Sequence, residues 1–265
     1  TTSLMRTAMI LWNADPILFQ IGPVAIHWYG VLFATGFLLG YQLMQRIYRQ
    51  ENRPTEQLDK LLTYIFIGTV VGARLAHTLI YEPDFYLAHP VEILKVWEGG
   101  LASHGGGVGV LLAIWLFVRQ HPENKFLWLA DRLAIPTALT GGFIRLGNFM
   151  NSEIVGNPTD GSWGVVFQRI DALPRHPVQL YEAACYFVIF AVLLSLLRTN
   201  RSQQHGFLLG LFLVLVFSAR FVIEFFKTPQ ASYEAGNMIS VGQWLSVPFV
   251  LAGVLLMYLA AKRHH

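Results

Sequence analysis

Residues 206–226 read GFLLGLFLVLVFSARFVIEFF, and this stretch decides the fold class. A helix rises about 1.5 Å per residue, so a run of this length can cross the roughly 30 Å of a bilayer's hydrocarbon. Its only ionisable residues, Arg220 and Glu224, lie near its C-terminal end. The stretch therefore predicts a membrane-spanning helix that carries two charges near one end.

The rest of the chain repeats this pattern. Of its 265 residues, 54% are hydrophobic and 13% charged, and the mean hydropathy is +0.46, which together indicate an integral membrane protein. We expect an all-α protein of seven transmembrane helices that form a single transmembrane domain over residues 1–265. The predicted spans are 24–45, 61–81, 104–119, 127–150, 178–197, 206–226 and 239–261.

Three of the segments outside the predicted spans carry further signals. Residues 1–23 predict a short periplasmic lead-in on the outer surface, and 82–103 predict a short helix at the interface. Residues 151–177, rich in glycine, proline and aspartate, predict a small periplasmic cap that is too short for a core of its own.

The distribution of lysine and arginine predicts the orientation. With the N-terminus outside, eleven of the nineteen fall on the cytoplasmic side, five fall outside and three lie within spans. Cytoplasmic loops collect these residues, so we expect a periplasmic N-terminus and a cytoplasmic C-terminus. The net charge of +3 is then a topology signal, and no motif for RNA or DNA accompanies it.

The three arginines within spans are Arg74, Arg145 and Arg220. One charged residue at the centre of a membrane helix costs about 2.5–3.5 kcal/mol on insertion scales, so such residues normally have a function. In the predicted topology all three fall in the outer half of the bilayer. The other polar residues expected at this depth are His27, Tyr29 and His104.

A shared depth predicts one polar cavity that opens toward the outer leaflet or the periplasm. Guanidinium groups suit a phosphate, and a phospholipid headgroup is the obvious anion there. Internal ion pairing is the alternative: Arg220 and Glu224 are four residues apart and could neutralise each other. Arg74 could likewise be purely structural.

A dense polar run follows Arg145, with Asn148, Asn151, Glu153 and Gly156 at the mouth of a span. Two amides, a carboxylate and a guanidinium make a poor lipid-facing surface, while glycine lets backbone N–H groups approach a ligand. A capping loop is the alternative.

His104 lies in LASHGGGVGV, at the start of a predicted helix. The positive end of the helix dipole favours neutral imidazole, which can accept a proton, and the glycines leave room for a ligand. These features favour a general base, although a structural histidine is the other reading.

Together these residues resemble the bacterial prolipoprotein diacylglyceryl transferase family. The strongest match is Arg145-Leu-Gly-Asn148-Phe-Met-Asn151-Ser-Glu153-Ile-Val-Gly156. The other matching motifs, in family order from about residue 15 onward, are HWYG at 27–30, GAR at 72–74, WEGGLASHGG at 97–106, RHPVQLYE at 175–182 and RFVIEFF at 220–226.

The resemblance implies a seven-helix enzyme of the bacterial inner membrane. It would move the diacylglyceryl group of phosphatidylglycerol to the thiol of a lipobox cysteine in the signal peptide of a preprolipoprotein, releasing glycerol phosphate. We expect no cofactor, and no metal-ligand spacing is seen. A transporter or flippase for an anionic lipid is the alternative, but it should carry polar residues toward both faces. An intramembrane protease lacks a convincing set of partner residues.

The resemblance also assigns roles. Arg145 and Arg220 would hold the phosphate, and His104 would be the base for the thiol. The residues expected to bind or support the substrate are Tyr29, Arg74, Asn148, Asn151, Glu153, Gly156 and Glu224. The chain departs from the family pattern at Ile144 before the signature arginine, at Ser103 before the histidine, and in lacking a tyrosine shortly before Arg220.

Overall fold

The computed structural model describes residues 8–95, 103–228 and 240–263. Contacts divide the chain into two compact units. The first unit consists of residues 1–43 and 131–265, and the second of residues 44–130. Two long helices, α1 (Trp28–Gln50) and α5 (Phe126–Met150), contribute residues to both.

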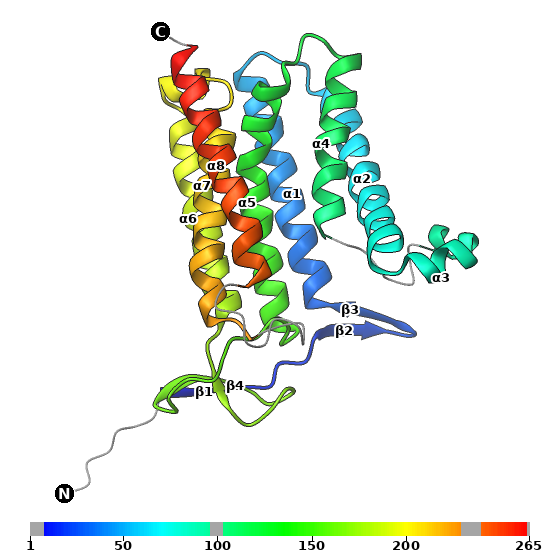
Figure 1. The fold of residues 1–265 in the computed structure, drawn as a ribbon, viewed down its shortest axis with the longest axis vertical. Helices are drawn as coiled ribbons and strands as arrows, with labels where there is room; N and C mark the ends of the chain where they lie inside the picture. The colour runs from blue at the N-terminus through cyan, green and yellow to red at the C-terminus, as the bar shows by residue number, and fades with distance from the viewer. Residues whose placement is uncertain (1–7, 96–102, 229–239, 264–265) are drawn as a thin grey trace, which may run out of the picture. The chain divides into compact units, whose positions relative to one another are not determined.

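Apolar helices build most of the first unit. They are residues 28–43 of α1 and 131–150 of α5, together with α6 (Val178–Leu197), α7 (Phe207–Ile223) and α8 (Val241–Lys262). α7 packs against α6 and α8 (Figure 1). It approaches α8 closely where a Cβ on Gly253 would lie 2.6 Å from the carbonyl oxygen of Gly210. Small residues of this kind let membrane helices pack without intervening side chains.

The second unit is built on two helices, α2 (Glu56–Ala76) and α4 (Ser103–Gln120). After α2 the chain continues through a π-helical turn, η1 (His77–Tyr81), the short helix α3 (Pro83–Ala88) and a 3₁₀ turn, η2 (Pro90–Leu94). The short helix predicted within 82–103 is thus present as α3.

Glycines set the contact between α2 and α4. A Cβ on Gly109 would lie 1.9 Å from the carbonyl oxygen of Gly68, and one on Gly105 would lie 2.2 Å from that of Gly72. The sequence suggested that the glycines after His104 leave room for a ligand. Gly105 and Gly109 instead make room for α2.

The prediction of an all-α fold is wrong outside the long helices. A parallel pair joins β1 (Ala8–Trp12) to β4 (Trp163–Phe167), and β4 pairs antiparallel with β5 (Pro174–Arg175). A separate hairpin joins β2 (Ile17–Ile21) to β3 (Val24–His27), so the helix predicted from residue 24 begins only at Trp28. Strand pairing satisfies backbone groups that these segments would otherwise leave unpaired.

The segment 151–177 also has a small core, which the sequence did not predict. Phe149, Val165 and Phe167 are buried together, and Trp12, Val155 and Leu180 pack around them. The ring centroids of Trp12 and Phe149 are 4.3 Å apart, and the Trp12 indole donates a 3.2 Å hydrogen bond to the Phe149 carbonyl. The segment forms a core because the lead-in, α5 and α6 supply half of it.

Within the described residues, each of the seven predicted spans overlaps a long helix. In the part of the chain that the structure describes, four helical stretches are long and apolar enough to cross a membrane: Glu56–Ile80, Val178–Leu197, Phe207–Phe226 and Gly242–Lys262. These four indicate a multi-pass membrane protein. α4 is shorter, and α5 carries Asp131, Arg132 and Arg145, so neither is a clear span by hydropathy alone.

Candidate functional site

A row of paired acidic and basic side chains lies in the first unit, where α5 and α7 end and α6 begins. Nε of Arg145 lies 2.9 Å from Oε2 of Glu182, and the other oxygen of Glu182 lies 2.8 Å from Nζ of Lys227. Lys227 also lies 3.3 Å from Oε2 of Glu224. Glu182 therefore connects a residue of α5 with one that follows α7.

These four side chains are largely removed from solvent. Their exposed fractions are 5% for Glu182, 9% for Lys227, 14% for Glu224 and 16% for Arg145. Charges buried to this degree need partners, because desolvation costs several kcal/mol per ion. The mutual pairing explains how the fold tolerates them.

Arg220 differs from the other basic residues of this cluster. Among the described residues, no carboxylate oxygen lies within 4.0 Å of its guanidinium, and Glu224 pairs with Lys227 instead. The alternative of an Arg220–Glu224 ion pair is therefore wrong. Arg220 lies in the last turn of α7.

Arg220 lines a cavity between α6 and α7. The cavity is small: its volume is about 10 Å³, which is room for about one water molecule. Its polar lining is Arg220, Glu182, Tyr186 and Cys185, and its apolar lining is Ile189, Val216, Ala219 and Ile223. This mixed lining of charged and apolar side chains suits the boundary between a lipid's headgroup and its acyl chains, and a lipid could enter only if the cavity opened.

The polar run after Arg145 folds into a hydrogen-bonded network. Nη1 of Arg145 donates to Asn148 (3.3 Å), and the amide of Asn148 donates to Glu153 (2.9 Å). The Asn151 amide donates to the other Glu153 oxygen (2.9 Å). The structure thus brings these four predicted residues together, with the exposed carboxylate of Glu153 held by two amides.

The backbone of this run is strained. Ser152 and Ile154 have positive φ angles of 57° and 54°. A β-branched residue in this region is rare and costs about 1–3 kcal/mol, so the surrounding structure must hold it. The buried Gln179 of α6 does so from one side, because its amide donates a 2.5 Å hydrogen bond to the Glu153 carbonyl.

Gly156 allows two backbone segments to approach each other. A Cβ there would lie 2.5 Å from the carbonyl oxygen of His176 and 2.8 Å from that of Phe226. Arg175 donates to the Gly156 carbonyl (3.0 Å), and a backbone bridge joins Gly156 to Lys227. The structure thus gives Gly156 a positioning role for the segment that carries Lys227.

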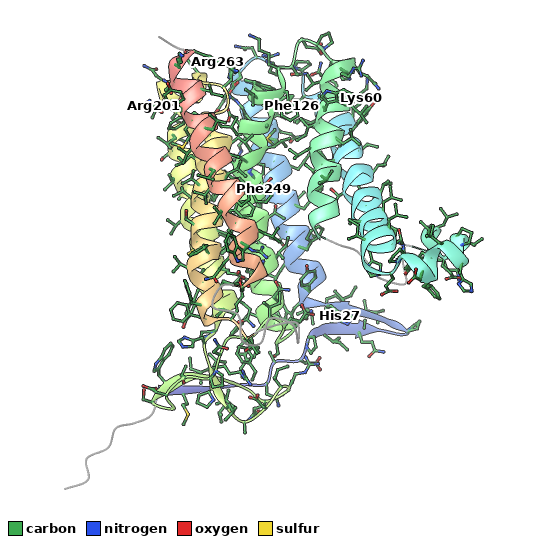
Figure 2. All side chains as sticks on the ribbon, in the orientation of Figure 1. His27, Lys60, Phe126, Arg201, Phe249 and Arg263 are labelled. Atoms are coloured by element: carbon green, nitrogen blue, oxygen red, sulfur yellow. The ribbon has the colours of Figure 1, made fainter. Side chains whose placement is uncertain are left out.

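Tyr29, in the first turn of α1, belongs to the same region of the first unit. Its ring packs against Gly147 of α5, where a Cβ would lie 2.7 Å from it, and it lies within electrostatic reach of Arg145 and Glu153. His27 is the last residue of β3, exposed where the strand meets α1 (Figure 2).

Arg74 and His104 belong to the second unit. Arg74 is buried and donates to the carbonyl oxygens of Glu92 (2.5 Å) and Ile93 (2.9 Å), with its guanidinium 5.1 Å from the Tyr86 ring centroid. These contacts secure the connection after α2. His104 is the second residue of α4, and its side chain lies outside the described part of the structure.

The sequence reasoning assigned no role to Glu182 or Lys227. A usable signal existed for Glu182, because it is the one carboxylate of the otherwise apolar α6, as anomalous there as the arginines are in their helices. Lys227 directly follows the predicted span at 206–226 and resembled an ordinary loop lysine. Only tertiary structure shows that it turns back toward Glu182.

No metal cluster accompanies this site. Among the described residues, no group of three or more histidine, cysteine, aspartate or glutamate side chains could hold a metal ion. The chemistry that the cluster offers is the binding of an anion by guanidinium groups.

Comparison with known proteins gives a consistent result. Residues 16–259 match the family model described as prolipoprotein diacylglyceryl transferase. The phosphatidylglycerol–prolipoprotein diacylglyceryl transferase of Tolumonas auensis is 84% identical over 254 residues, which cover 96% of this chain and 98% of that protein.

More distant relatives carry the same name. The protein of Chloroherpeton thalassium is 51% identical over 97% of this chain and 96% of its own length. That of Porphyromonas gingivalis is 43% identical over 96% of each. These names match the resemblance found in the sequence motifs and give no support to a lipid transporter.

Proposed function

Because the chain belongs to the prolipoprotein diacylglyceryl transferase family, we propose that it moves the diacylglyceryl group of phosphatidylglycerol to the thiol of a lipobox cysteine in a preprolipoprotein. The family identifies a transferase with phosphatidylglycerol and a prolipoprotein as its substrates. The cluster around Arg145 and Arg220 is the proposed site for the phosphate of the lipid.

The observation that carries this assignment is that Arg220 lines the α6–α7 cavity and pairs with no carboxylate among the residues that the structure describes. Arg145 lies across the same cluster, bound to Glu182, which lines that cavity. Two guanidinium groups near a partly apolar cavity suit a phosphate joined to a diacylglycerol. Asn148, Asn151 and Glu153 would hold Arg145 and shape the headgroup site, while Tyr29, Gly156 and Glu224 would support it.

The proposed reaction displaces phosphate from carbon. The cysteine thiolate attacks the glycerol carbon that bears the phosphate, a carbon–sulfur bond forms, and the carbon–oxygen bond breaks with its electron pair going to the phosphate oxygen. The products are a thioether and glycerol phosphate. The leaving group gains negative charge in the transition state, and fixed guanidinium groups stabilise such charge most strongly where water is scarce.

His104 is our candidate for the group that removes the thiol proton. A free thiol has a pKa near 8.5, and the thiolate is the nucleophile, so a neutral imidazole accelerates the step. His104 lies in the first turn of α4. Changing His104 to alanine should therefore reduce turnover more than lipid affinity.

The location that we propose is the bacterial inner membrane. In this arrangement the chain crosses seven times as a single transmembrane domain, with a periplasmic N-terminus and a cytoplasmic C-terminus. The excess of lysine and arginine on the inner side supports this orientation. The polar cluster would then face the periplasm, where secreted preprolipoproteins emerge.

A reconstituted reaction tests the proposed function. Purified protein, phosphatidylglycerol and a lipobox peptide should yield a diacylglyceryl thioether, detected by mass spectrometry, and an equal amount of glycerol phosphate. Arg145→Ala should lose both products together. The proposal fails if the native protein forms no thioether, and the site assignment fails if Arg145→Ala is as active as the native protein.

A further inference from the structure

Glu182 is shared by two basic residues. One oxygen lies 2.8 Å from the Lys227 ammonium, and the other lies 2.9 Å from Nε of Arg145. No hydrogen-bond donor among the described residues is aligned with this second oxygen, despite the short distance. The contact with Arg145 is therefore an attraction between charges without an aligned hydrogen bond.

In this geometry Glu182 and the lipid phosphate compete for the guanidinium of Arg145. In the proposed function Arg145 binds the phosphate of phosphatidylglycerol, and a carboxylate held against the same guanidinium reduces its attraction for that phosphate. A second cation on Glu182 offsets this effect, because it neutralises the carboxylate and fixes its position. Lys227 is placed to supply that cation.

The main chain fixes Lys227 at this place. A backbone bridge joins it to Gly156, and the preceding carbonyl, that of Phe226, accepts a 2.7 Å hydrogen bond from the Asn157 N–H. Its side chain is 9% exposed and also lies 3.3 Å from Glu224. These backbone contacts do not depend on the lysine side chain, so substitution of the side chain leaves them in place.

We propose that Lys227 is a positioning residue that holds Glu182 and so keeps Arg145 available for phosphate. The inference rests on the proposed function, since it takes the lipid phosphate as the ligand of Arg145. When phosphate arrives, Arg145 exchanges its poorly aligned contact with Glu182 for the phosphate, and Glu182 stays paired with Lys227. Glu182 thus neutralises Arg145 while no phosphate is bound.

Lys227→Met tests the first part of this inference. Without the ammonium, Glu182 is left to Arg145 alone, so the KM for phosphatidylglycerol should rise about tenfold while kcat falls less than about threefold. Lys227→Arg keeps the charge and should restore most of the affinity. Thermal unfolding in detergent, measured for each variant, reports whether the chain is folded.

Glu182→Gln separates action through Glu182 from direct binding of phosphate by Lys227. In a chain that carries Glu182→Gln, adding Lys227→Met should change the KM by less than about twofold, because the carboxylate that competes for Arg145 is no longer there. The double variant does not leave the buried Glu182 carboxylate without its lysine, so it serves if Lys227→Met alone is unstable, and Glu224 loses Lys227 equally in both backgrounds. Equal effects of Lys227→Met in both backgrounds would overturn the inference.

Asn157→Ala is the matched structural control. The Asn157 side chain donates to the Phe225 carbonyl (3.3 Å) and so secures the same segment without touching the ion pairs. If this variant raises the KM as much as Lys227→Met does, loosening of the segment explains the effect and the inference fails. Arg145→Ala tests the proposed function separately: if it keeps a native KM and native turnover, the phosphate site itself is misassigned.

Discussion

Arg220 is the residue at which we expect a substitution to lower activity without lowering stability. Arg220 lines the cavity, and its guanidinium pairs with no carboxylate among the described residues. We expect Arg220→Ala to lower kcat/KM for phosphatidylglycerol about 10²- to 10³-fold, as the loss of one group that stabilises transition-state charge usually does. Arg220→Lys should recover part of this activity, because lysine keeps the charge without the planar fork.

The same variant should leave the fold almost unchanged. Arg220→Ala breaks no ion pair of the described structure, so its melting temperature in detergent should fall by less than about 2 °C, the shift expected for about 0.5 kcal/mol. A large loss of stability would mean that Arg220 is structural.

Arg74 should show the opposite behaviour. It donates to the carbonyl oxygens of Glu92 and Ile93, and hydrogen bonds from a charged group contribute about 1.5–3 kcal/mol each. Arg74→Met should therefore lower the thermal stability clearly while changing the KM for phosphatidylglycerol less than about threefold. A normal melting temperature with a large rise in KM would return Arg74 to the substrate site.

At the scale of elements, the contact between α2 and α4 makes a sharp prediction. A Cβ on Gly109 would lie 1.9 Å from a backbone oxygen, which cannot rotate away. Gly109→Ala must therefore separate the two helices, at a cost of about 1–3 kcal/mol. Gly107→Ala is the control on the same helix, because nothing lies within 4 Å of its added Cβ and alanine favours the helix. Equal melting temperatures for the two variants would contradict this packing.

The segment 151–177 should be sensitive to acid through Asp171. Hydrogen bonds from Arg175 hold the pKa of Asp171 below its ordinary value of 3.8. A carboxyl group with a lowered folded pKa stabilises the fold fully above its unfolded pKa, and this contribution is lost as the pH falls through the folded pKa.

Asp171→Asn measures this contribution. The native protein should melt at a higher temperature than the variant at about pH 5, and the difference should shrink toward about pH 2 as Asp171 takes up a proton. Arg175 also donates to the Gly156 carbonyl, so loss of the pair should loosen the segment that carries Lys227. A difference in melting temperature that stays constant down to low pH would exclude Asp171 as its source.

Sequence predicted the helices well because hydrophobic length is a local property. The span predicted at 178–197 coincides with α6. The strands were missed because their signals are weak and their pairing is remote: β1 pairs with β4 about 155 residues later, as in the register Ala8↔Trp163. No pattern within either segment specifies that partner.

The candidate site was predictable to a similar degree. Arg145 and Arg220 stood out because a charge in an apolar helix is costly, and Asn148 and Glu153 stood out as a dense polar run. Lys227 was missed because its burial depends on a bridge to Gly156, a contact across 71 residues. Which cation neutralises which carboxylate follows from tertiary structure alone.

At the scale of the whole molecule, the predicted seven crossings place the chain's two ends on opposite sides of the membrane. Asn13 and Arg263 are exposed near these ends, so Asn13→Cys and Arg263→Cys can each report a side in a chain whose native cysteine is changed by Cys185→Ser. In intact spheroplasts a membrane-impermeant maleimide should label position 13 directly and position 263 only after permeabilisation. Ser162→Cys should behave like position 13, because β1 and β4 are paired.

Labelling of positions 13 and 263 from the same side would mean an even number of crossings. The four clear spans would then fit the chain better than seven, and the orientation derived from the lysine and arginine bias would have to be abandoned.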